Sequence, residues 1–136
     1  MSKKIKALLI KPDEPPKVVD IDYSLESLQN LVGGWTEEVC PFVDDVALIC
    51  NEEGKMIGLK LNRALRDESG KIYDIVAGDF LICGLDEYGY CDLSEELINK
   101  YTMIFRHPEM FVHTENGINA IRIPIVNLEE LLVPAT

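Results

Sequence analysis

The apolar segment Val46-Ala47-Leu48-Ile49-Cys50 decides the fold that the sequence predicts, because few runs in the chain are as long. A polar loop of hairpin length, carrying Gly54, follows it. Beyond the loop, the side chains of residues 56–61 would alternate between the two faces of a strand, and one face would carry Ile57, Leu59 and Leu61. Two such runs around a short loop predict a β-hairpin made of strands 46–50 and 56–61.

The sequence before this hairpin predicts three further strands and one helix. Residues 4–10 form a buried strand, residues 18–21 a second short strand, and residues 35–39 a third. Ser24 is placed to cap a helix whose apolar side chains share one face. Gly33-Gly34 is placed to end that helix.

The sequence after the hairpin predicts two strands and a second helix. Residues 72–76 and 80–83 are strand-like, with Gly78 as a bend or bulge between them. Asp92, with Glu95 three residues on, predicts a capping box for the helix. Its apolar stripe consists of Leu97, Ile98, Tyr101 and Phe105, and it stops before Pro108.

The tail predicts a last hairpin and a short helix. Asn116-Gly117 lies between residues 110–114 and 118–126, which is typical of a hairpin turn, and Pro124 indicates an edge strand. Asn127 with Glu130 predicts the short helix. The fold class is therefore α+β: a single domain over residues 1–136, mostly antiparallel sheet, with two main helices.

Size and composition fit a cytoplasmic protein of one domain. The chain has 136 residues, of which 47% are hydrophobic, which is ordinary for a folded domain. No apolar run approaches the roughly 20 residues that cross a bilayer. The apolar stretch near the amino terminus is too short for a secretion signal.

The four cysteines are expected to be buried, reduced thiols. Cys40, Cys50, Cys83 and Cys91 contain no Cys-x-x-Cys pair, and a chain without a secretion signal rarely forms disulfides. A zinc site would need His107 or His113 to join distant cysteines, and the spacing does not suggest it. We therefore expect no metal and no cofactor.

The formal charge of −11 restricts the partners of the chain. Residues 18–54 contain no Lys or Arg, whereas binding to a phosphate backbone needs a basic face. We therefore expect no direct nucleic-acid or membrane partner. The acidic surface is either solvated charge or a surface that imitates nucleic acid and fits a basic protein.

Residues 51–80 are richer in positive charge than the rest of this acidic chain, because five of the thirteen cationic residues fall within them. Arg63 could grip a phosphate or carboxylate, Asn62 could bind an amide or base edge, and Tyr73 could stack. The alternative is an Arg63–Asp74 ion pair inside an ordinary sheet. The cations form a cationic island: Lys55, Lys60, Arg63, Arg66 and Lys71.

Three separated phrases resemble the family catalogued as domain of unknown function 3846. They are residues 45–55, the segment Leu61-Asn62-Arg63-Ala64-Leu65-Arg66-Asp67, and residues 72–82, and residues 25–34 also fit. The resemblance covers about residues 4–105 and leaves residues 106–136 as an extension. It implies an accessory protein of a phage or mobile element, with a shared polar site at Asn62, Arg63, Tyr73, Asp74 and Gly78.

Our main hypothesis is a non-catalytic binder of a small anionic ligand, such as a nucleotide immune signal sequestered in the host cytosol. The expected ligand-binding residues are Asn62, Arg63, Arg66, Tyr73 and Asp74. The alternative is an acidic inhibitor or DNA mimic that docks on a basic host defence protein. A third hypothesis is an enzyme that hydrolyses such a nucleotide, with Asp74 and the histidines as candidates. A homodimer is compatible with the edge strand in the tail.

Overall fold

Two apolar strands, β4 (Val46–Asn51) and β7 (Phe80–Asp86), form the centre of an antiparallel sheet. The computed structural model describes residues 3–124, so the predicted short helix at Asn127 and Glu130 lies outside the described residues, as do the last two residues of the predicted strand 118–126. The sheet has the order β2-β1-β7-β4-β3, and β8 (Gly89–Cys91) pairs with β7. Leu48 and Leu8 lie opposite Ile82 from its two sides.

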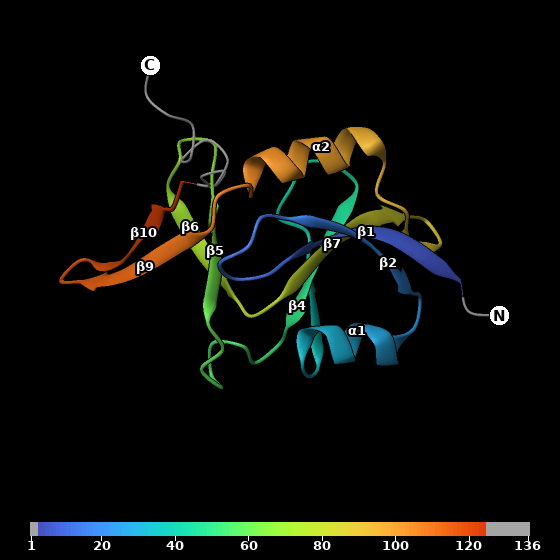
Figure 1. Cartoon of the computed structure of the whole chain (residues 1–136), viewed down its shortest axis with the longest axis horizontal. Coiled ribbons are helices and arrows are strands. Elements are labelled where there is room, and N and C mark those ends of the chain that lie inside the picture. Colours follow the sequence, from blue (N-terminus) through green and yellow to red (C-terminus); the bar gives the residue numbers. More distant parts are fainter. Residues whose placement is uncertain (1–2, 125–136) are drawn as a thin grey trace, which may run out of the picture.

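Both faces of this sheet are covered, which explains why its central strands show no alternation (Figure 1). Helix α1 (Leu25–Val32) packs Leu28 and Val32 on one face. On the other face lie α2 (Glu95–Ile104) and the hairpin of β5 (Leu61–Arg66) with β6 (Ile72–Ala77). Within residues 3–124 the chain is therefore an α+β protein with two helices and mostly antiparallel strands.

The remaining strands confirm most of the predicted elements. They are β1 (Lys4–Ile10), β2 (Lys17–Asp22), β3 (Thr36–Val39), and the tail hairpin of β9 (Glu109–Thr114) and β10 (Gly117–Arg122). Ser24 caps α1 as predicted, and Gly33 ends it in the left-handed conformation. Gly78 is the predicted bend between β6 and β7, with a φ of 81°.

The predicted pairing of residues 46–50 with residues 56–61 is wrong. Residues 52–58 form turns, and β5 begins only at Leu61. The reason is that β3 and β7 occupy both edges of β4, so a third strand has no edge to join. The strand that begins at Leu61 pairs instead with β6, across the turn at residues 67–70.

The predicted cap of the second helix is also wrong. The N-cap is Ser94, whose hydroxyl accepts a hydrogen bond from the N–H of Leu97 at 3.3 Å. Asp92 instead accepts the N–H of Lys6 at 2.7 Å, so its carboxylate ties the start of α2 to β1. The Asp92 carboxylate thus binds a backbone N–H of β1, whereas the local sequence pattern predicted that it would bind an N–H at the start of the helix.

All four cysteines are free thiols, but only Cys50 and Cys83 are buried. Burial raises the pKa of Cys50 to about 11 and that of Cys83 to about 12, so both stay protonated at neutral pH. Cys40 is exposed, which corrects the expectation of buried thiols at that position. No helix within residues 3–124 is long and apolar enough to cross a membrane.

Candidate functional site

The structure places the five predicted ligand-binding residues in three different environments. Asn62 and Arg63 lie in the interior, with exposed fractions of 0% and 1%. Asp74 faces one side of the β5–β6 hairpin, whereas Arg66 and Tyr73 line a groove on the other. They do not form one site.

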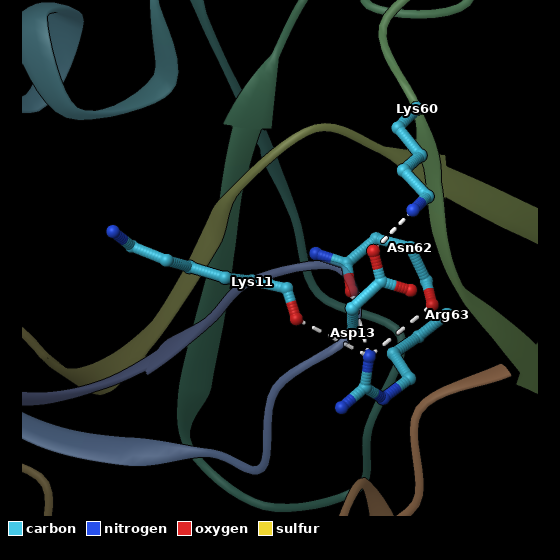
Figure 2. Close-up of polar contacts among 5 residues, drawn as sticks. All are labelled: Lys11, Asp13, Lys60, Asn62 and Arg63. Atoms are coloured by element: carbon cyan, nitrogen blue, oxygen red, sulfur yellow. Dashed lines mark hydrogen bonds and ion pairs between the residues drawn. The ribbon is translucent and has the colours of Figure 1, made fainter. Parts of the chain in front are cut away.

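The guanidinium group of Arg63 is surrounded by carbonyl oxygens (Figure 2). Its Nε donates to the carbonyl of Phe105 at 3.1 Å, and its Nη2 donates to the carbonyl of Glu14 at 2.6 Å. Its Nη1 donates to Asn62 Oδ1 at 2.8 Å and lies within 3.4 Å of the carbonyl of Lys11. All three guanidinium nitrogens therefore bind the protein itself, and a ligand cannot reach them.

The burial of two consecutive polar residues results from an irregularity in β5. Adjacent side chains of a regular strand point to opposite faces, but the register with β6 shifts between Leu61 and Arg63. Asn62 then donates to the carbonyls of Ile10 at 2.9 Å and Gly78 at 2.8 Å. Asn62 thus joins the ends of β1 and β6, and its amide is occupied.

Several charges act on Arg63. Burial lowers the pKa of its guanidinium, and the carboxylates of Glu109 and Asp13 act in the opposite direction. The carbonyl of Phe105 is at the C-cap of α2, where a cation also interacts favourably with the helix dipole. The Arg63–Asp74 ion pair of the alternative interpretation is not formed, because Asp74 pairs with Lys55 at 2.6 Å.

Glu109 is a buried functional group that the sequence interpretation missed. Its side chain is 2% exposed and forms an ion pair with Arg66. Its second oxygen accepts the N–H of Ala64 at 2.8 Å, which holds the start of β9 against β5. The only signal in the sequence is a single carboxylate before the apolar stretch 110–112.

The cationic island is largely neutralised by intramolecular contacts. Lys55 pairs with Asp74, Lys60 with Asp13, and Arg66 with Glu109. Figure 2 shows Lys60 and Asp13 beside the Arg63 cluster. The island is therefore mainly a structural feature, and its cations do not gather on one surface.

The largest hollow that contains predicted site residues is the groove that Arg66 and Tyr73 line, with a volume of about 660 Å³. Its walls are the loop 41–43, residues 66–69 at the end of β5, and residues 100–104 of α2. Tyr73 is 53% exposed there. Lys100, which we did not predict, contributes a second cation from the α2 wall. We call this hollow the α2 groove.

A hydrogen-bonded cluster supports one wall of the α2 groove. Asp44 accepts hydrogen bonds from Lys100 Nζ and from the Tyr101 hydroxyl, both at 2.6 Å. These two bonds lower the pKa of Asp44. Burial and the bond to Asp44 raise the pKa of Tyr101, so its hydroxyl remains a donor at neutral pH. The loop 41–43 is thereby fixed to α2.

A second hollow, of about 260 Å³, lies on the opposite side of the β5–β6 hairpin and includes Asp74. Glu37, Glu52 and Glu53 also line it, and Lys55 is its single cation. Its charge does not suit an anionic ligand.

The histidines do not form a catalytic group with Asp74. Among residues 3–124, no hydrogen bond or ion pair joins them, and no group of three or more His, Cys, Asp or Glu side chains could hold a metal ion. Arg106 Nε donates to His107 Nε2 at 2.9 Å, and His113 is exposed on β9.

The comparisons with known proteins place the chain in one family. The family model described as Domain of unknown function (DUF3846) matches residues 5–106. No curated protein and no solved structure matches the chain.

The buried position of Arg63 gives a prediction about stability. Arg63→Lys keeps the charge but removes the planar arrangement of five donors, so some of the surrounding carbonyls lose their partner. We expect the free energy of unfolding to fall by about 2–4 kcal/mol, as measured by urea denaturation. Lys71→Arg, at an exposed position of the same hairpin, is the matched control and should change it by less than about 0.5 kcal/mol. An unchanged midpoint for Arg63→Lys would contradict the structural role.

The lowered pKa of Asp44 gives a prediction about pH. A carboxyl group whose pKa is lower in the folded state stabilises the fold above its unfolded value of 3.8 and loses this contribution as the pH falls. At neutral pH, Asp44→Asn should therefore unfold more easily than the wild type. The difference should shrink between about pH 5 and pH 3, measured by thermal denaturation. Asp45→Asn, at the exposed neighbouring position, is the control for the loss of a carboxylate in the same loop.

Proposed function

The chain belongs to the family described as Domain of unknown function (DUF3846), and from that premise we propose that it binds and sequesters a small anionic ligand of the nucleotide class. The observation that supports this best is the α2 groove, where an exposed aromatic ring and two cations line one hollow. The proposed biological role is that of a non-catalytic accessory protein of a phage or mobile element that counters host defence. That part rests on the family resemblance alone.

The groove has the size and chemistry that a nucleotide needs. Its volume of about 660 Å³ lies within the usual range for small-molecule sites. The half-exposed ring of Tyr73 offers a stacking face, and stacking a base on an aromatic side chain contributes roughly 1–3 kcal/mol. The ammonium of Lys100 and the guanidinium of Arg66 would bind phosphate.

Both cations already have carboxylate partners, yet both retain donors for a ligand. The side chain of Lys100 is 50% exposed, and its ammonium has three donors, of which one binds Asp44. Arg66 uses Nη2 for Glu109 and is 21% exposed. A phosphate would therefore share these cations with the protein, which favours a singly or doubly charged ligand over a densely charged polymer.

The acidic residues of the groove restrict where an anion would lie. Asp67 Oδ1 accepts hydrogen bonds from Ser69 and Lys71 within the turn, and these bonds lower the pKa of Asp67. This carboxylate stays ionised and repels phosphate. The base would therefore lie on Tyr73, and the phosphate would lie toward Lys100.

In this proposal Asn62 and Arg63 are positioning residues. Arg63 binds the carbonyl that ends α2, and α2 supplies Lys100, Tyr101 and Ile104 to the groove. Asn62 fixes β5, which ends in Arg66. These residues shape the groove from behind and do not touch the ligand.

The proposal is tested by a thermal-shift and calorimetry screen against cyclic and ADP-ribose-like nucleotides. A binding nucleotide should raise the melting temperature of the wild type, and Tyr73→Ala should weaken its affinity about tenfold or more through lost stacking. Tyr88→Ala removes an equally large exposed ring from the β7–β8 turn and should bind normally. The absence of any response across the panel would refute ligand sequestration. Product formation above one turnover per protein would favour the hydrolase hypothesis.

A second candidate function is an acidic inhibitor of a basic host protein. The observation that favours it is Trp35, which is 68% exposed at the start of a segment rich in carboxylates. Three exposed glutamates lie near Trp35. Glu37 and Glu38 follow it closely in the chain, and the N–H of Glu52 donates a hydrogen bond to its carbonyl. Exposed tryptophans are frequent energetic centres of protein interfaces, and the carboxylates would suit a basic partner.

The inhibitor proposal predicts salt-sensitive capture of a basic DNA-binding protein from host lysate. Trp35→Ala should weaken this capture about tenfold or more, because anchoring aromatic residues contribute 2 kcal/mol or more to such interfaces. Tyr88→Ala again serves as the control for an exposed aromatic side chain. Capture that survives both Trp35→Ala and reversal of the neighbouring carboxylates would exclude this surface.

A further inference from the structure

The tail hairpin of β9 and β10 extends away from the rest of the chain (Figure 1). Its two strands form a separate sheet, in which β10 pairs with no other strand among residues 3–124. The hairpin is joined to the domain at its base, where Glu109 binds Ala64 and Arg66. Isolated two-stranded ribbons are marginally stable in water, so a further partner is expected. Residues 109–122 also lie beyond the family match, which ends at residue 106.

Among residues 3–124, no strand pairs with the outer edge of β10, so the backbone groups on that edge have no strand partner. The N–H of Ile123 bonds inward to the carbonyl of Pro108 at 2.7 Å. Because backbone groups alternate in direction along a strand, the N–H and C=O groups of Ile118, Ala120 and Arg122 point outward. Such an edge is a template for another strand.

The hairpin carries little negative charge: within residues 109–122 the acidic residues are Glu109, which is paired with Arg66, and Glu115 in the turn. Strand β10 contains no carboxylate in a chain of net charge −11, and its one charged residue is Arg122. A second copy of the chain therefore approaches this edge without the repulsion that it meets at the acidic surface. The large apolar side chains that are more than a third exposed include Met110, Val112, Ile118 and Ile121.

We propose that β10 pairs antiparallel with β10 of a second copy, about a two-fold axis at Asn119. A two-fold axis perpendicular to the sheet leaves each side chain on its own face of the sheet. Residues that lie opposite each other must share a face, and side chains alternate along a strand, so the axis must pass between two copies of the same residue. With the axis at Asn119, Ile118 lies opposite the partner's Ala120, and Ile121 lies opposite the partner's Gly117. Each large side chain then meets a small one.

Charge and backbone chemistry select the same register. With the axis at Asn119, Arg122 lies opposite the partner's Asn116 and beside the partner's Glu115. An axis at Ala120 would place Arg122 opposite the partner's Ile118. An axis at Ile121 would place Ile118 opposite the partner's Pro124, which has no N–H to donate. Of these three registers, only the axis at Asn119 places Arg122 beside a carboxylate of the partner and keeps the outward donors matched.

The result would be a four-stranded sheet that joins two domains. Met110, Val112 and Ile121 share one face of the hairpin. In the dimer, these side chains and the same side chains of the partner would lie on one continuous face of the four-stranded sheet. This assembly does not depend on the ligand of the α2 groove. The interface belongs to the tail hairpin, whereas the groove lies between α2 and the β5–β6 hairpin.

The first experiment measures the mass of the full chain by light scattering and sedimentation. At about 100 µM, a dimer of micromolar Kd is almost fully formed, so the mass should be twice 15.3 kDa. Arg122→Glu should raise the dimer Kd about tenfold, because it opposes the partner's Glu115. Adding Glu115→Arg to Arg122→Glu should restore the dimer, since the pair is then reversed. Lys71→Glu, at an exposed position outside the tail hairpin, changes the net charge in the same direction and by the same amount, and should leave the dimer Kd unchanged.

A cysteine crosslink tests the register. Residues on the axis form a non-hydrogen-bonded pair, whose Cα atoms are about 4.5 Å apart, a distance that a disulfide spans. Asn119→Cys should therefore give a covalent dimer under mild oxidation, whereas the wild type, with its exposed Cys40, should not. A wild-type monomer at about 100 µM would overturn the proposal. So would a dimer that neither responds to Arg122→Glu nor crosslinks through Asn119→Cys.

Discussion

The fold depends on a buried guanidinium group whose positive charge must be satisfied within the protein. Arg63 meets this requirement with oxygens of its neighbour Asn62 and of two segments that are distant in the sequence, the loop after β1 and the end of α2. Burying the cation without such acceptors would cost several kcal/mol. The segments that carry the acceptors must therefore lie beside Arg63 in the folded chain. The loop and the helix end supply carbonyl acceptors that their own secondary structure leaves free, because both lie outside a hydrogen-bonded ladder.

This constraint positions the groove that we propose as the ligand site. The loop that binds Arg63 follows β1, and the helix end that binds it follows the turn of α2 that carries Lys100 and Tyr101. Asp44 then joins this turn to the loop 41–43. The walls of the groove are therefore connected to the buried cluster through α2. Pre-organised walls favour binding, because less ordering remains to be done when a ligand arrives.

The sequence predicted the elements whose signals are local. Ser24 and Gly33 mark the ends of α1, and the apolar runs 46–50 and 80–83 mark the central strands. The sequence-based prediction was wrong where a residue distant in the sequence determines the local structure. Residues 56–61 resemble a strand, but β3 and β7 already occupy the edges of β4. Asp92 resembles a cap, but the N–H of Lys6 takes its carboxylate. The burial of Arg63 depends on carbonyls from residues 11, 14 and 105, which no local pattern reveals.

The distribution of charge then explains how an acidic chain could still bind an anion. Lys55, Lys60, Arg66 and Lys100 are held in ion pairs with carboxylates, and the excess of acidic residues leaves the chain with a net charge of −11. At physiological salt, exposed charges are screened beyond about 8 Å, so the potential inside a groove is set mainly by the side chains that line it. The α2 groove is lined by two cations, Arg66 and Lys100, and by two carboxylates, Asp67 and Glu68. The hollow at Asp74 is more acidic, because four carboxylates and a single lysine line it. For this reason we propose the α2 groove, where Arg66 and Lys100 lie, as the place where a single small anion binds.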